Sequence, residues 1–154
     1  MNIFAGVLAL LFCVYAGYQL SLKYAKRKNY YIEYDAFNQA LISNVAFTNQ
    51  SIIKLINNIK DNKDDFSINI KDYFLNKKED INSSILLDNE KDELLQYFRT
   101  IGSSDAKTQL KFLEDQKERL KERLKICLQE EKKYKSFYIK LGFLFGLIIF
   151  IILL

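Results

Sequence analysis

The 154-residue sequence contains no histidine, proline or tryptophan, and only two cysteines. Without histidine, neither a Ser-His nor a Cys-His nucleophile pair can be built. Two cysteines are too few for an ordinary zinc site, so we expect neither a metal nor a cofactor. Neither GxxxxGK[ST] nor GxGxxG occurs, which removes the usual support for nucleotide binding. These absences predict a protein that is not an enzyme and has no catalytic residues.

Charge is missing from both ends of the chain. All 23 Lys and Arg and all 19 Asp and Glu lie between Lys23 and Lys140. A soluble protein does not need charge-free ends, whereas segments embedded in hydrocarbon must lack charged side chains. The pattern predicts an N-terminal transmembrane anchor at 1–22, a cytoplasmic helical domain at 23–136 and a C-terminal transmembrane anchor at 137–154.

The first apolar run, Ile3 to Leu20, would extend about 27 Å as a helix, close to the hydrocarbon thickness of a bilayer. A secretory signal peptide is the competing interpretation. Such peptides place their positive charge before the apolar run, whereas here the basic cluster follows it. We therefore expect an uncleaved anchor.

The second apolar run, Leu141 to Leu154, would extend only about 21 Å. Including 137–140 lengthens it, because Lys140 can direct its ammonium to the headgroups while Tyr134, Phe137 and Tyr138 form an interfacial aromatic belt. A buried core helix is the alternative, but residues 143–154 are apolar on every face. A second span is favoured.

Basic residues flank the central domain on both sides, which places that domain in the cytoplasm by the positive-inside rule. The same placement favours contact with membrane lipid over nucleic acid. The clusters comprise Lys23, Lys26, Arg27, Lys28, Lys132, Lys133, Lys135 and Lys140.

Both anchors carry small residues at helical spacing, which allow helices to approach closely in lipid. These stripes could pack on each other, on a second copy of the chain or on another membrane protein, so a homo-oligomer stays open. The transmembrane packing residues are Ala5, Ala9, Cys13 and Gly17 in the first anchor and Gly142 and Gly146 in the second.

The central domain shows helical periodicity, so the predicted fold class is all-α, a helical bundle between two transmembrane helices. One apolar face carries Tyr34, Phe37, Leu41 and Val45, and short helices are expected around Ile52–Ile59 and Ile68–Leu75. Residues 61–65 and 76–84 resemble a turn and a loop. A further helix capped by Asp88 or Asn89 should end at Gly102.

Ser103 or Ser104 is expected to cap the longest helix, with Asp105 in its first turn. Neither Gly nor Pro interrupts the chain from Asp105 to Leu141, so this helix should continue into the membrane. Leu113, Leu120, Cys127 and Tyr134 recur every seven residues and predict its packing face.

The stretch from Leu95 to Leu113 resembles the stage III sporulation protein AB family. Its leucine/isoleucine-Gly-x-Ser-Asp-x-x-x-Gln pattern is matched by Ile101, Gly102, Ser104, Asp105 and Gln109. The layout is similar over essentially the whole chain, and the residue-level similarity begins at about residue 94.

This resemblance implies a platform or adaptor in a secretion-like complex between mother cell and forespore, in the mother-cell membrane that faces the forespore. The family is similar to the inner-membrane platform of type II secretion and type IV pilus systems, which implies a cytoplasmic secretion-type ATPase and other membrane components as partners. Arg99, Asp105 and Gln109 are the candidate partner-binding residues. In the alternative interpretation, none of the three binds a partner. Asp105 then interacts favourably with the helix dipole, and Arg99 and Gln109 are ordinary solvated side chains.

Three alternatives stay open: a platform component of type II secretion or type IV pili, a self-associating structural scaffold, and a small pore. The pore is disfavoured because neither anchor has a polar face to line a path for water.

Overall fold

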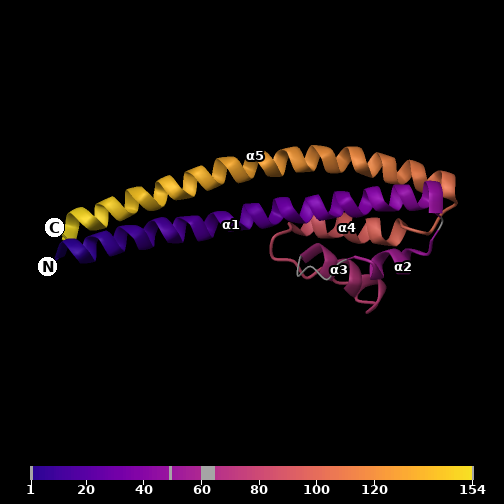
Figure 1. Cartoon of the computed structure of the whole chain (residues 1–154), viewed down its shortest axis with the longest axis horizontal. Helices are drawn as coiled ribbons and strands as arrows, with labels where there is room; N and C mark the ends of the chain where they lie inside the picture. Colours follow the sequence, from indigo (N-terminus) through magenta and orange to yellow (C-terminus); the bar gives the residue numbers. More distant parts are fainter. Residues whose placement is uncertain (1, 49, 60–64, 154) are drawn as a thin grey trace. The chain divides into compact units, whose positions relative to one another are not determined.

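The computed structural model describes residues 2–48, 50–59 and 65–153. They form five α-helices and one π-helix, and no strand occurs within these ranges, which confirms the predicted all-α class. The expected turn at 61–65 lies outside the described residues except for Asp65, where a helix begins. In chain order the elements are α1 (Asn2–Ser43), the π-helix η1 (Asn44–Thr48), α2 (Ile52–Asn57), α3 (Asp65–Phe74), α4 (Asp88–Thr100) and α5 (Ala106–Leu153) (Figure 1).

The chain divides into two units that share its long helices. The helix-pair unit consists of Met1–Lys28 and Lys125–Leu154, and the central unit of Asn29–Leu124. Each of α1 and α5 contributes one part to each unit. The predicted continuity of the longest helix into the apolar C-terminal run is thus confirmed, and α1 is continuous in the same way.

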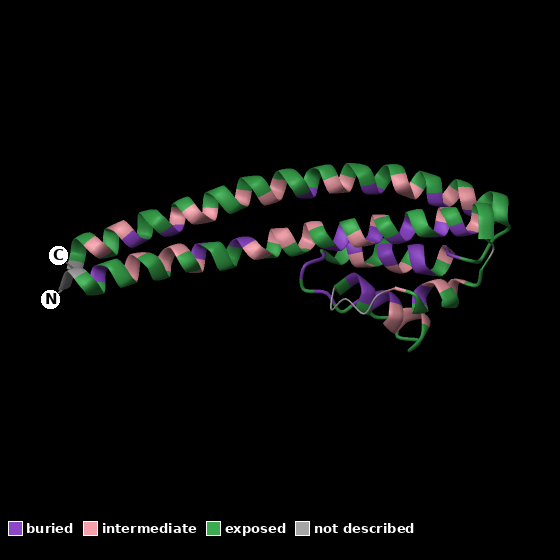
Figure 2. Ribbon diagram, viewed as in Figure 1, coloured by how far each residue is buried: buried purple, intermediate pink, exposed green. Residues whose placement is uncertain are grey.

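Two helical stretches, Phe4–Thr48 and Ala106–Ile152, are long and apolar enough to cross a membrane. A core helix of a soluble protein can also be apolar, but it is buried by its neighbours. Here only 17% and 11% of the most apolar 18-residue windows are buried within the chain. Figure 2 shows the helix-pair unit largely exposed. Its apolar surface therefore requires an apolar surrounding.

Phe66 on α3 is the centre of the aromatic core of the central unit. Its side chain is 1% exposed, and its ring stacks on Tyr34 with the centroids 5.3 Å apart. It also meets Tyr30 edge-on at 5.4 Å and lies 6.3 Å from Phe98 of α4. Aromatic pairs at such distances contribute about 0.5–1.5 kcal/mol each, beyond the stabilisation that comes from the area they bury. One α3 side chain thus joins α1, α3 and α4.

Three buried tyrosines of the core, Tyr30, Tyr34 and Tyr97, have a polar partner for the hydroxyl group. Tyr97 donates to Oδ1 of Asn38, whose amide donates in turn to the backbone oxygen of Leu113, both at 2.9 Å. Gln116 donates to Tyr34 at 3.0 Å. Burial raises the pKa of Tyr34 and of Tyr97, which keeps both hydroxyls protonated. The core therefore buries aromatic surface without leaving these polar groups unsatisfied.

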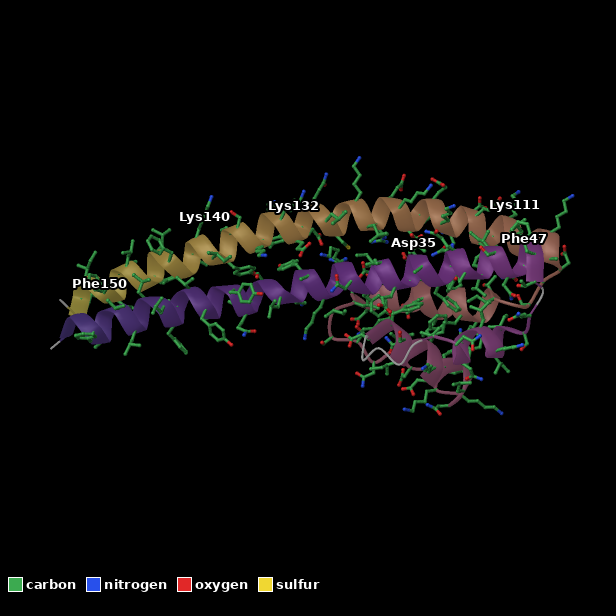
Figure 3. All side chains as sticks on the ribbon, in the orientation of Figure 1. Asp35, Phe47, Lys111, Lys132, Lys140 and Phe150 are labelled. Carbon is green, nitrogen blue, oxygen red and sulfur yellow. The ribbon has the colours of Figure 1, made fainter. Side chains whose placement is uncertain are left out.

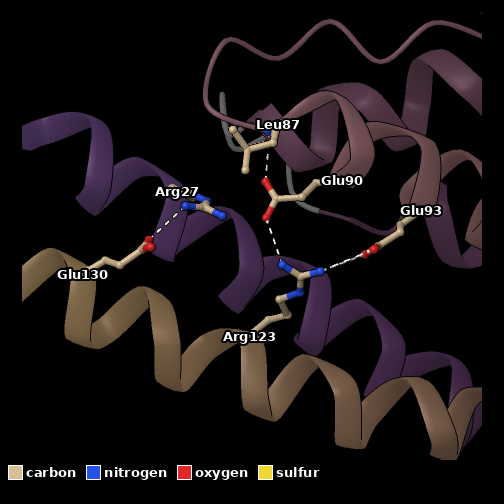
Figure 4. Close-up of polar contacts among 6 residues, drawn as sticks. All are labelled: Arg27, Leu87, Glu90, Glu93, Arg123 and Glu130. Carbon is tan, nitrogen blue, oxygen red and sulfur yellow. Dashed lines mark hydrogen bonds and ion pairs between the residues drawn. The ribbon is translucent and has the colours of Figure 1, made fainter.

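Helix α4 begins differently from the prediction. Asp88 is its first residue and Leu87 stands at the cap position, so capping by Asp88 or Asn89 was wrong. The carboxylate of Glu90 reaches back and accepts the Leu87 N–H at 2.9 Å, which serves the exposed backbone of the first turn. The buried Glu90 also faces Arg123 of α5 at 3.4 Å (Figure 4). One carboxylate thus starts α4 and ties it to α5.

The predicted packing faces are confirmed in the main. Tyr34, Phe37 and Leu41 are buried, whereas Val45 is half-buried. On α5 the seven-residue repeat buries its first three members and leaves the fourth half-buried: Leu113, Leu120, Cys127 and Tyr134. The helix expected at 68–75 begins three residues earlier, and 76–84 contains no helix, as predicted.

Two phenylalanines test the position of the core. Phe66→Ala should lower the free energy of unfolding of the central unit by about 3–5 kcal/mol, because the residue leaves a cavity between three helices. Phe47→Ala removes the same ring from a side chain that is 87% exposed, and should cost less than about 0.5 kcal/mol. Guanidinium unfolding of the full chain in micelles, followed by tyrosine near-ultraviolet circular dichroism, measures both. Equal losses would contradict the assigned core.

Candidate interaction sites

The turn between α4 and α5 has a fixed backbone. Gly102 adopts a φ of +76°, which favours glycine because other residues meet steric resistance there. A Cβ atom at Gly102 would also lie 2.7 Å from the side chain of Ile52 on α2. This turn is therefore a packed junction of α2, α4 and α5.

Gln109 holds this turn from the first turns of α5. Its side-chain oxygen accepts hydrogen bonds from the Gly102 N–H at 3.1 Å and from the Ser104 hydroxyl at 3.2 Å. The residue is 4% exposed, so the interpretation of Gln109 as a solvated side chain is wrong. Its position lets the amide fold back over the turn. Gln109 acts on the shape of the surface rather than as an exposed contact.

Asp105, and neither Ser103 nor Ser104, takes the cap position before α5. Its carboxylate accepts the backbone N–H of Thr108 at 3.1 Å, while Ser103 donates to Thr100 and Ser104 to Gln109. Hydrogen bonds from the side chain and the backbone of Thr108 lower the pKa of the exposed Asp105 carboxyl. The serines were wrong as caps because their hydroxyls are used within the turn.

Arg99 lies on the last turn of α4 and its side chain is 61% exposed. The guanidinium reaches Glu79 in the preceding loop at 3.3 Å, an exposed pair that contributes little to stability. Among the three predicted partner-binding residues, Asp105 and Gln109 meet in the α4–α5 turn. Arg99 remains available beside them, because breaking an exposed ion pair costs little.

The π-helix η1 presents an exposed aromatic residue that the sequence analysis missed. Buried Asn44 fixes it: Oδ1 accepts from the Thr48 hydroxyl at 2.6 Å and the Gln50 N–H at 2.9 Å, and Nδ2 donates to the Gln50 oxygen. Phe47 nevertheless remains 87% exposed. No sequence signal marked it as exposed, because an apolar residue within the charge-free run 36–53 is expected in the core.

Phe47 and the α4–α5 turn belong to one surface of the central unit. Asn44 bonds η1 to Gln50, α2 begins two residues later, and Ile52 of α2 contacts Gly102. Figure 3 shows Phe47 at the end of α1 beside the start of α5. We call this the corner surface; its exposed residues are Phe47, Gly102, Ser103, Ser104 and Asp105.

The glycines of the helix-pair unit let α1 and α5 touch through their backbones. A Cβ atom at Gly142 would lie 2.5 Å from the backbone oxygen of Cys13, and one at Gly146 would lie 3.0 Å from Cα of Leu10. One at Gly17 would clash with the backbone oxygen of Tyr138. Of the three arrangements left open by the sequence, these contacts correspond to packing of the two anchors within one chain, where α1 and α5 lie side by side (Figure 1). Packing on a second copy or on another membrane protein stays a prediction.

The register of the first stripe differs at its start. Ala5 is exposed and Ala9 half-buried, whereas the neighbouring Gly6 is buried. A Cβ atom there would lie 2.7 Å from the ring of Phe150. The contacting residues of α1 therefore include Gly6, Leu10, Cys13, Val14 and Gly17 rather than a strict every-fourth-residue series.

Charged and aromatic contacts continue this helix pair beyond its apolar part. Arg27 binds Glu130 at 2.9 Å (Figure 4), and Lys28 binds Glu131 at 3.0 Å. The ring of Tyr24 stacks on Tyr134 with the centroids 4.3 Å apart. Polar pairs therefore hold α1 and α5 together where their apolar packing ends.

Within the described ranges, no group of three or more His, Cys, Asp or Glu residues is placed to hold a metal ion. Neither Cys13 nor Cys127 forms a disulfide bond. The candidate interaction sites are therefore two surfaces, namely the corner surface and the exposed lysines of the helix-pair unit.

Comparison with known proteins gives a family match. A family model described as stage III sporulation protein AB matches residues 68–154, more than half of the chain. The match begins earlier than the residue-level similarity expected from about residue 94. It includes the α4–α5 turn, Gly142 and Gly146, whereas Phe47 and the whole of α1 precede it. Neither the curated proteins nor the solved structures yielded a match.

The glycine contacts predict a difference between two similar substitutions. Gly17→Ala should separate α1 from α5, because the new methyl group meets backbone that cannot move aside. Gly6→Ala should be tolerated, because the ring of Phe150 can rotate away. The measurement is thiol cross-linking between Tyr24→Cys and Tyr134→Cys in a background without native cysteines. Most of the yield should be lost with Gly17→Ala and kept with Gly6→Ala; equal yields would refute the packing.

The cap at Asp105 predicts a pH dependence. A lowered pKa means that the folded state favours the carboxylate, so its contribution is present above the ordinary value of 3.8 and is lost as pH falls through the lower folded value. Amide-exchange protection of Thr108, corrected for intrinsic rates, should fall below pH 3.8. Asp105→Asn should flatten this profile, since an asparagine cap does not titrate. Identical profiles would rule out the cap.

Proposed function

Because the chain belongs to the stage III sporulation protein AB family, we propose that it is a non-enzymatic adaptor of a sporulation-associated membrane complex and docks a cytoplasmic secretion-type ATPase through its central unit. The family gives the coarse part: a membrane protein with a role in sporulation. The docking partner, the cytoplasmic placement of the central unit and the mother-cell membrane are our proposal. The positive-inside distribution of Lys and Arg supports the placement.

The observation that carries the proposal is the corner surface. An aromatic side chain exposed to 87% stands on a π-helix, and π-helical turns are frequent at functional sites. Beside it, Gln109 fixes a turn that exposes Ser103, Ser104 and Asp105. A rigid surface with one exposed aromatic residue and a few polar groups is suited to a protein partner, because little entropy is lost when it binds.

Arg99 lies beside the corner surface, on the last turn of α4, and its charge makes the docking testable. Its guanidinium is only loosely paired with exposed Glu79 and can exchange that carboxylate for one on the ATPase. Asp105 is already engaged by Thr108, so it shapes the surface more than it binds. We therefore assign the direct contacts to Phe47 and Arg99, and the support of the turn to Gln109 and Asp105.

Binding of a purified secretion-type ATPase from the same cell to the full chain in nanodiscs tests this docking. Phe47→Ser should weaken the dissociation constant about 30-fold, as expected when a central aromatic anchor is lost. Arg99→Glu should also weaken it and make the remainder less dependent on salt. Leu87→Ser is the matched control, because Leu87 is another exposed apolar residue of the central unit, at the opposite end of α4.

Unchanged affinity for both Phe47→Ser and Arg99→Glu would refute the corner surface as the docking site. No binding of the ATPase by the unaltered chain would refute ATPase docking itself, and would favour the scaffold alternative. That alternative needs an interface between copies other than Gly142 and Gly146, whose close contacts are with α1 of the same chain.

A further inference from the structure

The basic residues beside the apolar parts of α1 and α5 fall into two groups that differ in their partners. Segments 23–28 and 130–140 together contain eight Lys and Arg but only two carboxylates. Glu130 and Glu131 pair with Arg27 and Lys28, which are both partly buried. The remaining six side chains are all exposed: Lys23, Lys26, Lys132, Lys133, Lys135 and Lys140.

These six lysines, which we call the lysine collar, carry positive charge that the nearby carboxylates leave unbalanced. Figure 3 shows Lys132 and Lys140 pointing away from α1. Lys133 lies with its ammonium 5.7 Å from the ring centroid of Tyr134, which is a weak contact and keeps its charge. The ion pairs between α1 and α5 thus do not involve the collar lysines, whose side chains are exposed.

The collar borders the apolar ends of both helices. Lys23 directly follows the charge-free residues 1–22, and Lys140 directly precedes Leu141. From Lys132 to Lys140 the helix rises about 12 Å, comparable with the headgroup layer and one Debye length of solution beyond it. Lysine side chains at these positions reach lipid phosphates while their stems lie along apolar surface.

We propose that the lysine collar is a binding site for anionic phospholipid headgroups, and that it enriches such lipids around the helix pair. The observation that favours a bilayer lipid over a soluble anion is continuity: the collar begins where each apolar helix end stops, so its ligand must lie at the membrane surface. The site is separate from the corner surface, and it requires no ATPase.

The experiment uses the full chain in phosphatidylcholine vesicles with spin-labelled phosphatidylglycerol or spin-labelled phosphatidylcholine. The motionally restricted fraction of each label gives the relative affinity of the lipids next to the protein. Each lysine near a lipid phosphate should favour the anionic label by about fivefold. At 0.5 M salt the screening length falls to about 4 Å, and most of this preference should disappear.

A charge-matched pair of variants assigns the preference to the collar. Lys132→Gln, Lys133→Gln, Lys135→Gln and Lys140→Gln together should remove most of the preference for the anionic label and leave only the part due to Lys23 and Lys26. Lys107→Gln, Lys111→Gln, Lys117→Gln and Lys121→Gln together remove the same charge from the same helix and should keep the preference. Circular dichroism confirms that both proteins are helical, and the salt titration of the unaltered chain tests the site even if the collar variant fails to insert.

Equal restriction of both labels by the unaltered chain at low salt would overturn the proposal, as would an equal loss in the two variants. Replacing chloride by inorganic phosphate at constant ionic strength separates a lipid site from a phosphate site. An unchanged preference supports the lipid headgroup, whereas its abolition would mean that free phosphate is the ligand. Loss of ATPase binding with intact lipid preference would affect only the proposed docking.

Discussion

The constraint on which the structure depends is that both ends of the chain lack charge and need an apolar surrounding. In hydrocarbon every backbone N–H and C=O must be satisfied within the segment, which an uninterrupted helix achieves. Apolar side chains gain little from meeting each other there, so close packing decides which helix faces pair. Gly17, Gly142 and Gly146 provide that approach in the helix-pair unit, and the Arg27–Glu130 and Lys28–Glu131 pairs hold the helices where water becomes available.

The central unit follows the rules of a protein core in water. Phe66 gathers rings from α1 and α4, and the hydroxyls of Tyr34 and Tyr97 find amide partners in Gln116 and Asn38. Directional hydrogen bonds of this kind specify one arrangement of the helices, because any slip leaves a buried polar group unpaired. Gln109 extends the same principle to the α4–α5 turn. The result is a corner surface whose backbone is fixed and whose exposed groups are few, which suits the docking that we propose.

The features that depend on a repeating sequence pattern could be predicted. Charge-free ends predicted the two apolar helices, and three-four spacing predicted the buried Tyr34, Phe37 and Leu41. The features that depend on one particular neighbour in space could not be predicted from the sequence. Glu90 rather than Asp88 serves the start of α4, and Gln109 is buried, because each side chain turns back on backbone that only the fold brings near. Gly6 replaces Ala5 because helix pairing, not spacing, sets the register. Phe47 was missed because an apolar residue within a charge-free run is expected in the core.

Cysteine accessibility in native membranes tests most directly whether lipid surrounds both apolar ends. Single cysteines would be placed along both long helices of an otherwise cysteine-free chain and exposed to a charged maleimide, with and without permeabilisation. Residues 7–20 and 143–152 should resist labelling on every helix face, whereas positions 23, 26, 132 and 135 should react from one side of the membrane. Labelling at outward positions such as Leu8 or Ile148, at rates similar to those of position 23, would contradict the account.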